Sequence, residues 1–209
     1  MRRVAESFAW PFRGEWRRAW WMGLVTVILV PLLFVPLLGY AVAATRAAEE
    51  DAAAGPPGWR LTRRLIVDGL WVSLALALSV LPFAIVWDPL ARLFGPGVDP
   101  AAARVVAALV LALPWGLLAL LHMPHATATL AATGKGRDML DLAASIRGVR
   151  HDFATWNVAA AGIVTGWAIG LACAGALCVG IVPGIFYAIL VSAHAAATLA
   201  RPGPHPSPR

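Results

Sequence analysis

The sequence predicts an all-α membrane protein, a polytopic helix bundle that forms one domain over residues 1–200. Of its 209 residues, 60% are hydrophobic and only 13% are charged, whereas a soluble domain is about half apolar and a quarter charged. The apolar residues gather in blocks of about 20, the length that a helix needs to cross a bilayer. These blocks cover residues 21–44, 65–87, 101–121, 156–179 and 181–199. A water-soluble globule is therefore excluded, and only the Pro-rich tail, residues 201–209, is expected to be disordered.

The first apolar block, residues 21–44, contains two prolines, Pro31 and Pro36. Proline lacks the backbone N–H of a helix and clashes with the preceding turn, so we expect the helix to break there. We predict a re-entrant hairpin, which enters the membrane and returns on the same side because each half is too short to cross. The alternatives are one Pro-kinked crossing, which gives five transmembrane helices, and a signal peptide.

The basic residues between the blocks favour the hairpin. If the first block re-enters, 15 of the 17 Lys and Arg residues lie on one side of the membrane, and only Arg92 and Arg104 lie on the other. If it crosses, the division is 7 against 10. Because cytoplasmic loops are enriched in Lys and Arg, we predict four transmembrane helices plus the N-terminal hairpin, with both termini in the cytoplasm. The net charge of +6 also indicates anionic lipid headgroups, and not nucleic acid, as a partner.

Two amphipathic stretches are expected to lie in the headgroup region as interfacial helices. In residues 137–153 the apolar side chains recur at helical spacing, and they are Met139, Leu142, Ile146, Val149 and Phe153. Near the N-terminus, aromatic side chains alternate with arginines, and tryptophan favours the headgroup level. The aromatic residues of this stretch are Trp10, Phe12, Trp16, Trp20 and Trp21.

The last two apolar blocks are separated only by Gly180, so we expect them to form a tight hairpin. Both carry small residues at every fourth position, a pattern that lets two membrane helices approach closely. We predict that the two rows face each other, and the alternative is an oligomer interface. The rows consist of Gly162, Gly166 and Gly170 in the first helix and Gly184, Ala188 and Ser192 in the second. Cys173 and Cys178 are interpreted as small packing residues.

Few polar side chains interrupt the apolar blocks. Asp68 stands near the start of the second block with Arg64 four residues before it, which predicts an interfacial ion pair. The functional alternative is a carboxylate that couples to protons or ions. His122, His125 and His194 are candidates for a metal or haem site, because imidazole is a common ligand of both. No further ligand stands at a fixed spacing from the first two, so we expect no cofactor and interpret them as polar residues at a span end.

Several short motifs occur in an order that resembles a known family. They are Pro11-Phe12 followed by Trp16, Gly39-Tyr40 near the end of the first block, Pro57 with Trp59, and Asp68-Gly69 at the start of the next block. In this order, and over nearly its whole length, the chain resembles the membrane family called domain of unknown function 4013. The resemblance implies a multi-pass protein of the prokaryotic inner membrane with no assigned activity.

These observations support three hypotheses about function. The first is a non-enzymatic scaffold, assembly factor or envelope-homeostasis factor that binds another membrane protein or a second copy of itself, because packing motifs are many and buried charges are few. The second is a carrier or binder of a lipid or small amphiphile, in a cavity lined by the Pro-broken first block. The third is a metal- or haem-dependent membrane enzyme that uses the three histidines.

Overall fold

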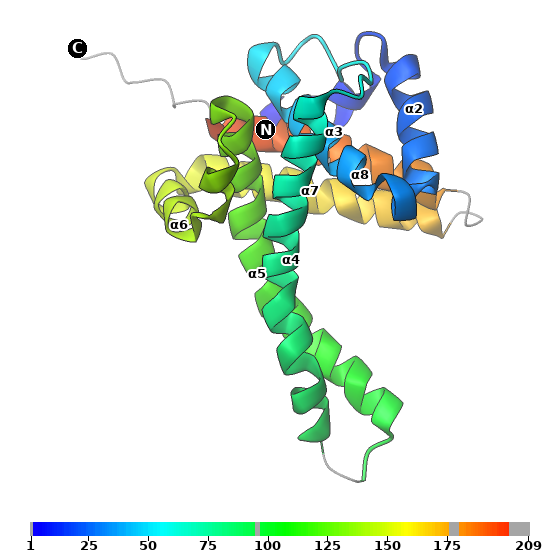
Figure 1. Ribbon diagram of the computed structural model, residues 1–209, viewed down its shortest axis with the longest axis vertical. Helices are drawn as coiled ribbons and strands as arrows, with labels where there is room; N and C mark the ends of the chain where they lie inside the picture. The colour runs from blue at the N-terminus through cyan, green and yellow to red at the C-terminus, as the bar shows by residue number, and fades with distance from the viewer. Residues whose placement is uncertain (1, 95–96, 176–179, 201–209) are drawn as a thin grey trace.

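The computed structural model describes residues 2–94, 97–175 and 180–200, and this part of the chain contains helices and connections without a strand. The expected all-α polytopic bundle is confirmed (Figure 1). Cys178 and the tail that we predicted to be disordered, residues 201–209, lie outside the described residues. The helices are α1 (Arg2–Ala9), η1 (Trp10–Phe12), α2 (Trp16–Ile28), α3 (Val30–Glu50), α4 (Arg63–Arg92), α5 (Pro100–Thr133), η2 (Gly136–Leu140), α6 (Leu142–His151), α7 (Phe153–Ala174) and α8 (Ile181–Ala200), where η1 and η2 are 3-10 helices.

The first apolar block folds as two helices, α2 and α3, with a sharp turn between them (Figure 1). Helical dihedral angles are interrupted at Leu29 and again at Leu33, so the turn lies earlier than the prolines alone suggest. Pro31 occupies the first turn of α3, where a missing N–H costs nothing, and Pro36 lies inside the helix beyond the kink. The expectation that both halves are too short to cross is wrong for α3, because its 21 residues continue past the apolar block to Glu50.

The two ends of the α2–α3 hairpin meet. The Arg13 guanidinium donates a hydrogen bond to the Ala52 carbonyl over 3.2 Å. Next to it, Gly14 has a φ of 60° and lies directly against the Ala54 carbonyl, in a position that leaves no room for a Cβ. The chain therefore enters and leaves this hairpin at the same level, as a re-entrant segment requires.

Cysteine labelling tests on which side the hairpin ends lie, because α3 is one of five described helices that are long and apolar enough to cross a membrane. In a protein whose Cys173 and Cys178 are replaced with serine, we expect Glu6→Cys and Ala53→Cys to react on one side of the membrane and Gly97→Cys on the other. The reagent is a membrane-impermeant maleimide, added to intact and to permeabilised cells. Labelling of positions 6 and 53 on opposite sides would show that α3 crosses and that the hairpin prediction is wrong.

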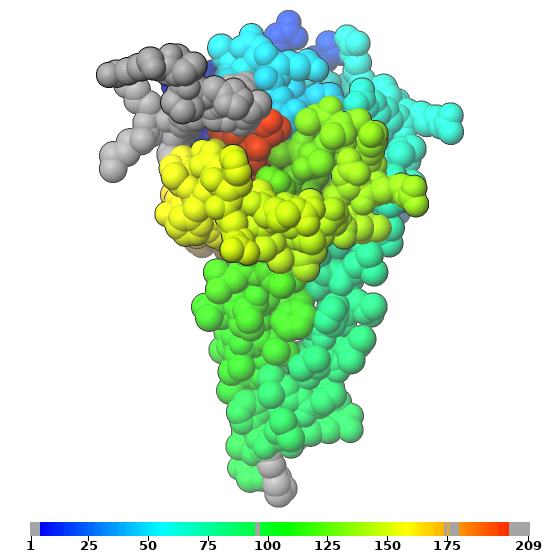
Figure 2. All heavy atoms as spheres, turned by 90° about the vertical axis from the view of Figure 1, so that its left-hand side faces the viewer, coloured from blue at the N-terminus to red at the C-terminus, as the bar shows by residue number. Residues whose placement is uncertain are grey.

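Helices α4 and α5 form a long hairpin along the longest axis of the molecule (Figure 1). With 30 and 34 residues, they are about 45 and 51 Å long, and their far half projects from the rest of the bundle (Figure 2). Asp88 pairs with Arg92 and Arg104 near the far end, where the Trp87 indole also donates a hydrogen bond to the Arg104 carbonyl (2.8 Å). Exposed leucines on both helices form a surface suited to lipid, among them Leu74, Leu78, Leu81, Leu109 and Leu118.

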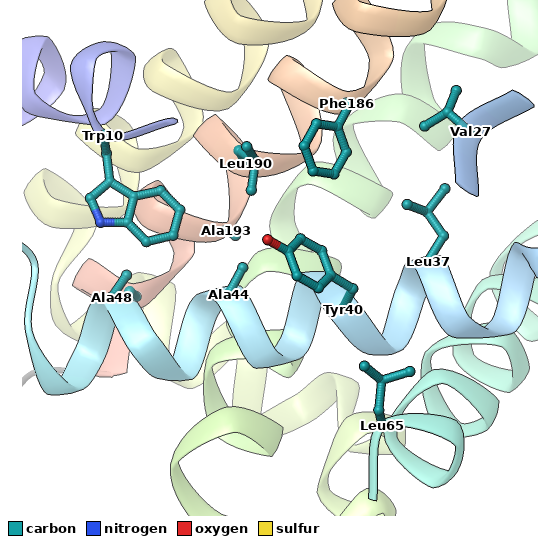
Figure 3. Packing of buried hydrophobic residues seen from close by; sticks show 11 residues of the cluster. Trp10, Val27, Leu37, Tyr40, Ala44, Ala48, Leu65, Phe186, Leu190 and Ala193 are labelled. Atoms are coloured by element: carbon teal, nitrogen blue, oxygen red, sulfur yellow. The ribbon is translucent and has the colours of Figure 1, made fainter. Parts of the chain in front are cut away.

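Helices α7 and α8 lie side by side and run across the α4–α5 hairpin (Figure 1). Of the five candidate spans, α8 is the most buried, and it packs against α2, α3 and α5 as well as α7. Phe186 and Leu190 of α8 share one core cluster with Tyr40 of α3 and Trp10 of η1 (Figure 3). Through this cluster α8 holds the N-terminal helices against the rest of the bundle.

The stretch that we expected to be one interfacial helix is divided. Residues 137–153 form η2, α6 and the start of α7. Asp141 caps the start of α6 and Asp152 caps the start of α7, because each carboxylate accepts a hydrogen bond from a free N–H group of the first turn. The donors are the N–H groups of Ala144 (2.8 Å) and Thr155 (3.0 Å). Hydrogen bonds from Thr155 also lower the pKa of the Asp152 carboxyl.

The aromatic residues near the N-terminus do not share one environment. Trp10, which we expected at the headgroup level, is fully buried, and its ring centroid is 5.4 Å from that of His194 in α8. Because α1 and η1 fold back onto α8, the Trp10 ring packs against protein and does not anchor the chain in lipid. Trp21 is 70% exposed, and Phe12 is half exposed and stacks on Trp20.

Candidate functional site

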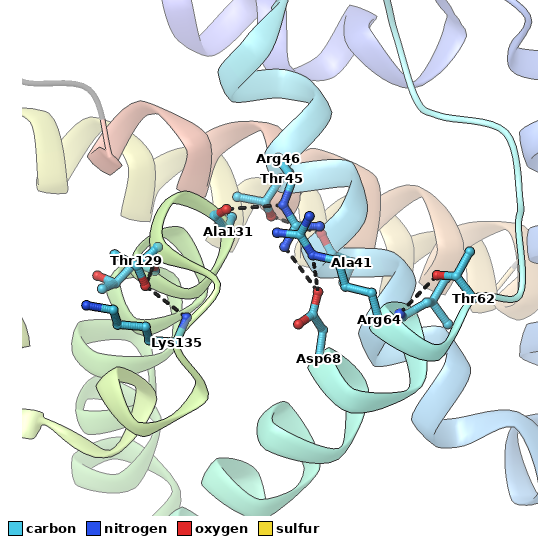
Figure 4. Close-up of polar contacts among 11 residues, drawn as sticks. Ala41, Thr45, Arg46, Thr62, Arg64, Asp68, Thr129, Ala131 and Lys135 are labelled. Carbon is cyan, nitrogen blue, oxygen red and sulfur yellow. Dashed lines mark hydrogen bonds and ion pairs between the residues drawn. The ribbon is translucent and has the colours of Figure 1, made fainter.

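A buried ion pair joins α3, α4 and α5 (Figure 4). The side chain of Asp68 in α4 is only 6% exposed, and its Oδ2 accepts a hydrogen bond from Nη2 of Arg46 in α3 over 3.1 Å. Nε of the same arginine donates a hydrogen bond to the Ala131 carbonyl in α5 (3.1 Å). Arg64, the partner that we predicted for Asp68, lies farther away, with Nε 4.0 Å from Oδ2. Asp68 is thus the acidic centre of a contact among three helices.

Arg46 is the member of this cluster that was not predicted from the sequence. It stands 22 residues before Asp68 and on a different helix, so no rule of local spacing connects the two residues. The available indication was a basic residue two positions after the end of an apolar block, where a helix can continue with one polar face.

Two glycines of the short motifs, Gly39 and Gly69, lie where α3 crosses α4. A Cβ on Gly39 would overlap the Leu65 carbonyl, and a Cβ on Gly69 would overlap the Val35 carbonyl. The two backbones therefore touch only because both positions are glycine. Close approach of this kind is a main source of stability between membrane helices, since lipid tails are as apolar as the helix surfaces.

Tyr40 and Trp59, two further motif residues, hold the connection between α3 and α4. Their rings stack with centroids 4.0 Å apart and 4° between the planes. The Tyr40 hydroxyl donates a hydrogen bond to the Pro57 carbonyl (2.9 Å), and the Trp59 indole donates one to the Ala19 carbonyl in α2 (3.1 Å). The connection is thereby fixed to both helices of the N-terminal hairpin.

The first motif lies at η1 and the start of α2. Pro11 is buried, and its carbonyl accepts a hydrogen bond from the Trp20 indole (2.8 Å). The rings of Phe12 and Trp16 meet edge to face, with centroids 6.0 Å apart. These residues support the entry to the α2–α3 hairpin and lie outside the ion-pair cluster.

An apolar cavity of about 830 Å³ opens between α3, α4, α5, α7 and α8. Its volume is within the usual range of ligand pockets, roughly 300–1,000 Å³. We predicted that the Pro-broken first block, residues 21–44, lines a cavity, and the block contributes to this one only beyond its prolines. Pro31 and Pro36 do not line it, and the later part of α3 does so with Leu38 and Ala41. On α5, the wall includes Gly116, where a Cβ would meet nothing within 4 Å.

A hydroxyl group in the wall of this cavity lacks a partner. Ser192 of α8 lines the cavity, and its Oγ is buried without a hydrogen bond to the residues that the structure describes. Thr45 lines the same cavity, but its hydroxyl donates a hydrogen bond to the Ala41 carbonyl of its own helix (2.9 Å). The Ser192 Oγ has almost no accessible surface, so Ser192 contributes to the cavity wall through its other atoms.

The predicted rows of small residues in α7 and α8 face each other only in part: Gly170 meets Gly184 and Ala188, whereas Ser192 is not opposite a glycine of α7. A Cβ on Gly170 would lie 2.5 Å from the Gly184 carbonyl oxygen and 3.3 Å from the Cβ of Ala188, so the backbones are in contact there. Toward the other end the helices separate, and a Cβ on Gly162 would lie 3.7 Å from its neighbour. The residues opposite Gly162 and Gly166 are Ala195 and Val191. The seam thus joins two helices of one chain.

The three histidines have separate neighbours. Nδ1 of His122 is 3.0 Å from Oγ of Ser145 in α6, and the His125 ring lies against the α6 backbone. Nδ1 of His194 is 2.9 Å from Oγ of Ser7 in α1. Within the described ranges, no three His, Cys, Asp or Glu side chains come close enough together to hold a metal ion.

A family model described as "Protein of unknown function (DUF4013)" matches residues 22–181. The matched part contains the glycine motifs, the ion pair and most of the apolar cavity, whereas Pro11, Phe12 and Trp16 precede it. No curated protein and no solved structure matches the chain.

Proposed function

The chain belongs to this family of proteins of unknown function, and we propose that it is a non-enzymatic membrane protein that binds a lipid chain or a small amphiphile. It is a multi-pass protein, and the observation that carries the proposal is the apolar cavity among five of its helices. In a membrane, such a cavity opens toward acyl chains, which fill it without leaving any polar group unsatisfied. Binding of this kind needs no catalytic residue.

The wall of the cavity indicates which molecules it accepts. All of its lining residues are uncharged, and most are alanine, leucine or other apolar residues. A charged group would lose its hydration there without gaining a partner. The part of the proposed ligand that enters the cavity is therefore apolar and uncharged.

A scaffold or assembly role is the second candidate, and the α4–α5 hairpin favours it. Its far half projects from the bundle with leucine side chains exposed on both helices (Figure 2). A partner helix or a second copy of the chain can cover this surface as well as lipid does. Light scattering of the purified protein in mild detergent distinguishes the ligand-binding role from the scaffold role. A monomer favours ligand binding alone, and an oligomer or a retained partner supports the scaffold.

Filling the cavity tests the proposed function. We expect Gly116→Phe to weaken the binding of phosphatidylcholine about tenfold, because a ring in the cavity removes apolar area that the lipid chain would bury. The measurement is native mass spectrometry of the detergent-purified protein, titrated with the lipid. Phosphatidylcholine is chosen because its zwitterionic headgroup limits the contribution of the basic surface.

Two variants serve as controls for the added ring. Gly116→Ala changes the helix propensity of this position without filling the cavity, and Ala77→Phe adds the same ring at an exposed position of α4 that does not line it. Both are expected to bind lipid like the parent protein. Unchanged binding in Gly116→Phe would contradict the proposed function, and so would an equal loss in Ala77→Phe.

A further inference from the structure

We propose a second binding site, for a phosphoryl group, where the connection between α3 and α4 meets the start of α4. A cavity of about 140 Å³ lies there, and we name it the arginine pocket. Three guanidinium groups line it, and each comes from a different segment: Arg46 from α3, Arg60 from the connection, and Arg64 from the first turn of α4. None of these residues lines the apolar cavity.

The charge of the arginine pocket is not balanced by the protein. Its lining contains three guanidiniums and one carboxylate, that of Asp68, which leaves a net charge of +2. Arg46 is bound to this carboxylate, whereas Nε of Arg64 is 4.0 Å from it and the Arg64 side chain is 61% exposed. Arg60 forms no ion pair within the described part of the chain. The guanidiniums of Arg60 and Arg64 therefore have N–H groups available to bind an anion.

The pocket is held in place before any ligand binds. Arg46 is fixed from two sides, by Asp68 and by the Ala131 carbonyl, each over 3.1 Å. The connection that carries Arg60 is fixed next to it by the stacking of Trp59 on Tyr40. A preformed arrangement of donors lowers the entropy that binding costs.

A phosphoryl group matches this arrangement better than a carboxylate does. Its two or three non-bridging oxygens point in different directions, so that guanidiniums from separate segments can each bind one. A planar carboxylate is matched by a single bidentate arginine, whereas the guanidiniums of the arginine pocket come from three separate segments. The pocket, at about 140 Å³, has room for a phosphoryl group and is much smaller than the apolar cavity of about 830 Å³.

The phosphoryl group can belong to a lipid headgroup or to a soluble phosphomonoester, and two ligands separate these sources. The full-length protein in neutral detergent is titrated with phosphatidic acid and with glycerol 3-phosphate. We expect Arg60→Gln and Arg64→Gln, each alone, to weaken binding about fivefold or more, since each removes a charge-assisted contact. Binding of phosphatidic acid alone identifies a headgroup site, and binding of both ligands identifies a site that also accepts soluble phosphates.

Arg63→Gln is the matched control. Arg63 is adjacent to Arg64 and exposed, but it does not line the arginine pocket. Its replacement removes the same charge and is expected to change binding less than about twofold, because salt screens distant surface charges. An equal loss in Arg63→Gln and Arg64→Gln overturns the proposal, and so does failure of the parent protein to bind either ligand. Gly116→Phe is expected to leave the binding of glycerol 3-phosphate unchanged, so the two proposed sites are tested independently.

Discussion

Replacing Gly39 with alanine is expected to lower the free energy of unfolding by about 3 kcal/mol. Overpacking usually costs about 1–3 kcal/mol, and the upper end applies here because only a shift of the backbone can make room for the new methyl group. The added methyl group would overlap the Leu65 carbonyl, and the amide N of Gly69 lies only 3.2 Å from the same position. Neither neighbour is a flexible side chain, so α3 and α4 have to move apart. For a chain of this length, we expect the midpoint of thermal unfolding in detergent to fall by about 6–12 °C.

Gly116→Ala is the matched control for this experiment. It makes the same substitution in the middle of a long apolar helix, but the new Cβ would meet nothing within 4 Å. Alanine favours a helix over glycine by about 1 kcal/mol, so this variant is expected to be at least as stable as the parent. Equal unfolding temperatures for Gly39→Ala and Gly116→Ala would contradict the backbone contact between α3 and α4.

Asp68→Ala is expected to cost about 2–4 kcal/mol of stability, because it leaves the guanidinium of Arg46 largely buried without its carboxylate. The Arg46 side chain is only 18% exposed, so water replaces the lost partner incompletely. The measurement is again thermal unfolding of the purified protein in detergent. A carboxylate that acts only in proton or ion coupling would leave the unfolding temperature unchanged, and that result would contradict the structural role of this ion pair.

Two further variants show whether the loss comes from the unpaired charge. In the double variant Arg46→Met with Asp68→Leu, both partners become apolar, and most of the stability is expected to return. Asp88→Ala removes a carboxylate from the exposed ion pairs with Arg92 and Arg104 at the far end of the α4–α5 hairpin. Pairs in contact with solvent contribute little, so this change is expected to cost less than about 1 kcal/mol.

The helices were predictable where local properties decide them. Long apolar blocks gave the candidate spans, and the single residue between the last two blocks predicted that α7 and α8 are neighbours. Their rows of small residues meet at Gly170 and Gly184 but not at Ser192. The sequence predicted that the helix of the first block breaks, but not where it breaks. Proline is tolerated in the first turn of a helix, so Pro31 lies in the first turn of α3 and the turn falls at Leu29.

The candidate sites were much less predictable. The apolar blocks contain no pattern that indicates a cavity, because its wall combines residues from five helices. The partner of Asp68 was assigned to Arg64 on the same helix, whereas Arg46 on α3 lies closer. Trp10 was predicted to lie at the membrane surface because tryptophan favours the headgroup level. The contact with α8 that buries it involves residues far apart in the chain.

Membrane insertion and helix formation depend on hydropathy, length and neighbouring residues, all of which can be read along the chain, and these properties established an all-α multi-pass protein. The choice of partners depends on how helices cross, since a crossing brings together residues that no local rule connects. Only the tertiary structure shows that Gly39 meets Gly69, that Arg46 reaches Asp68, and that three arginines from separate segments surround one small pocket.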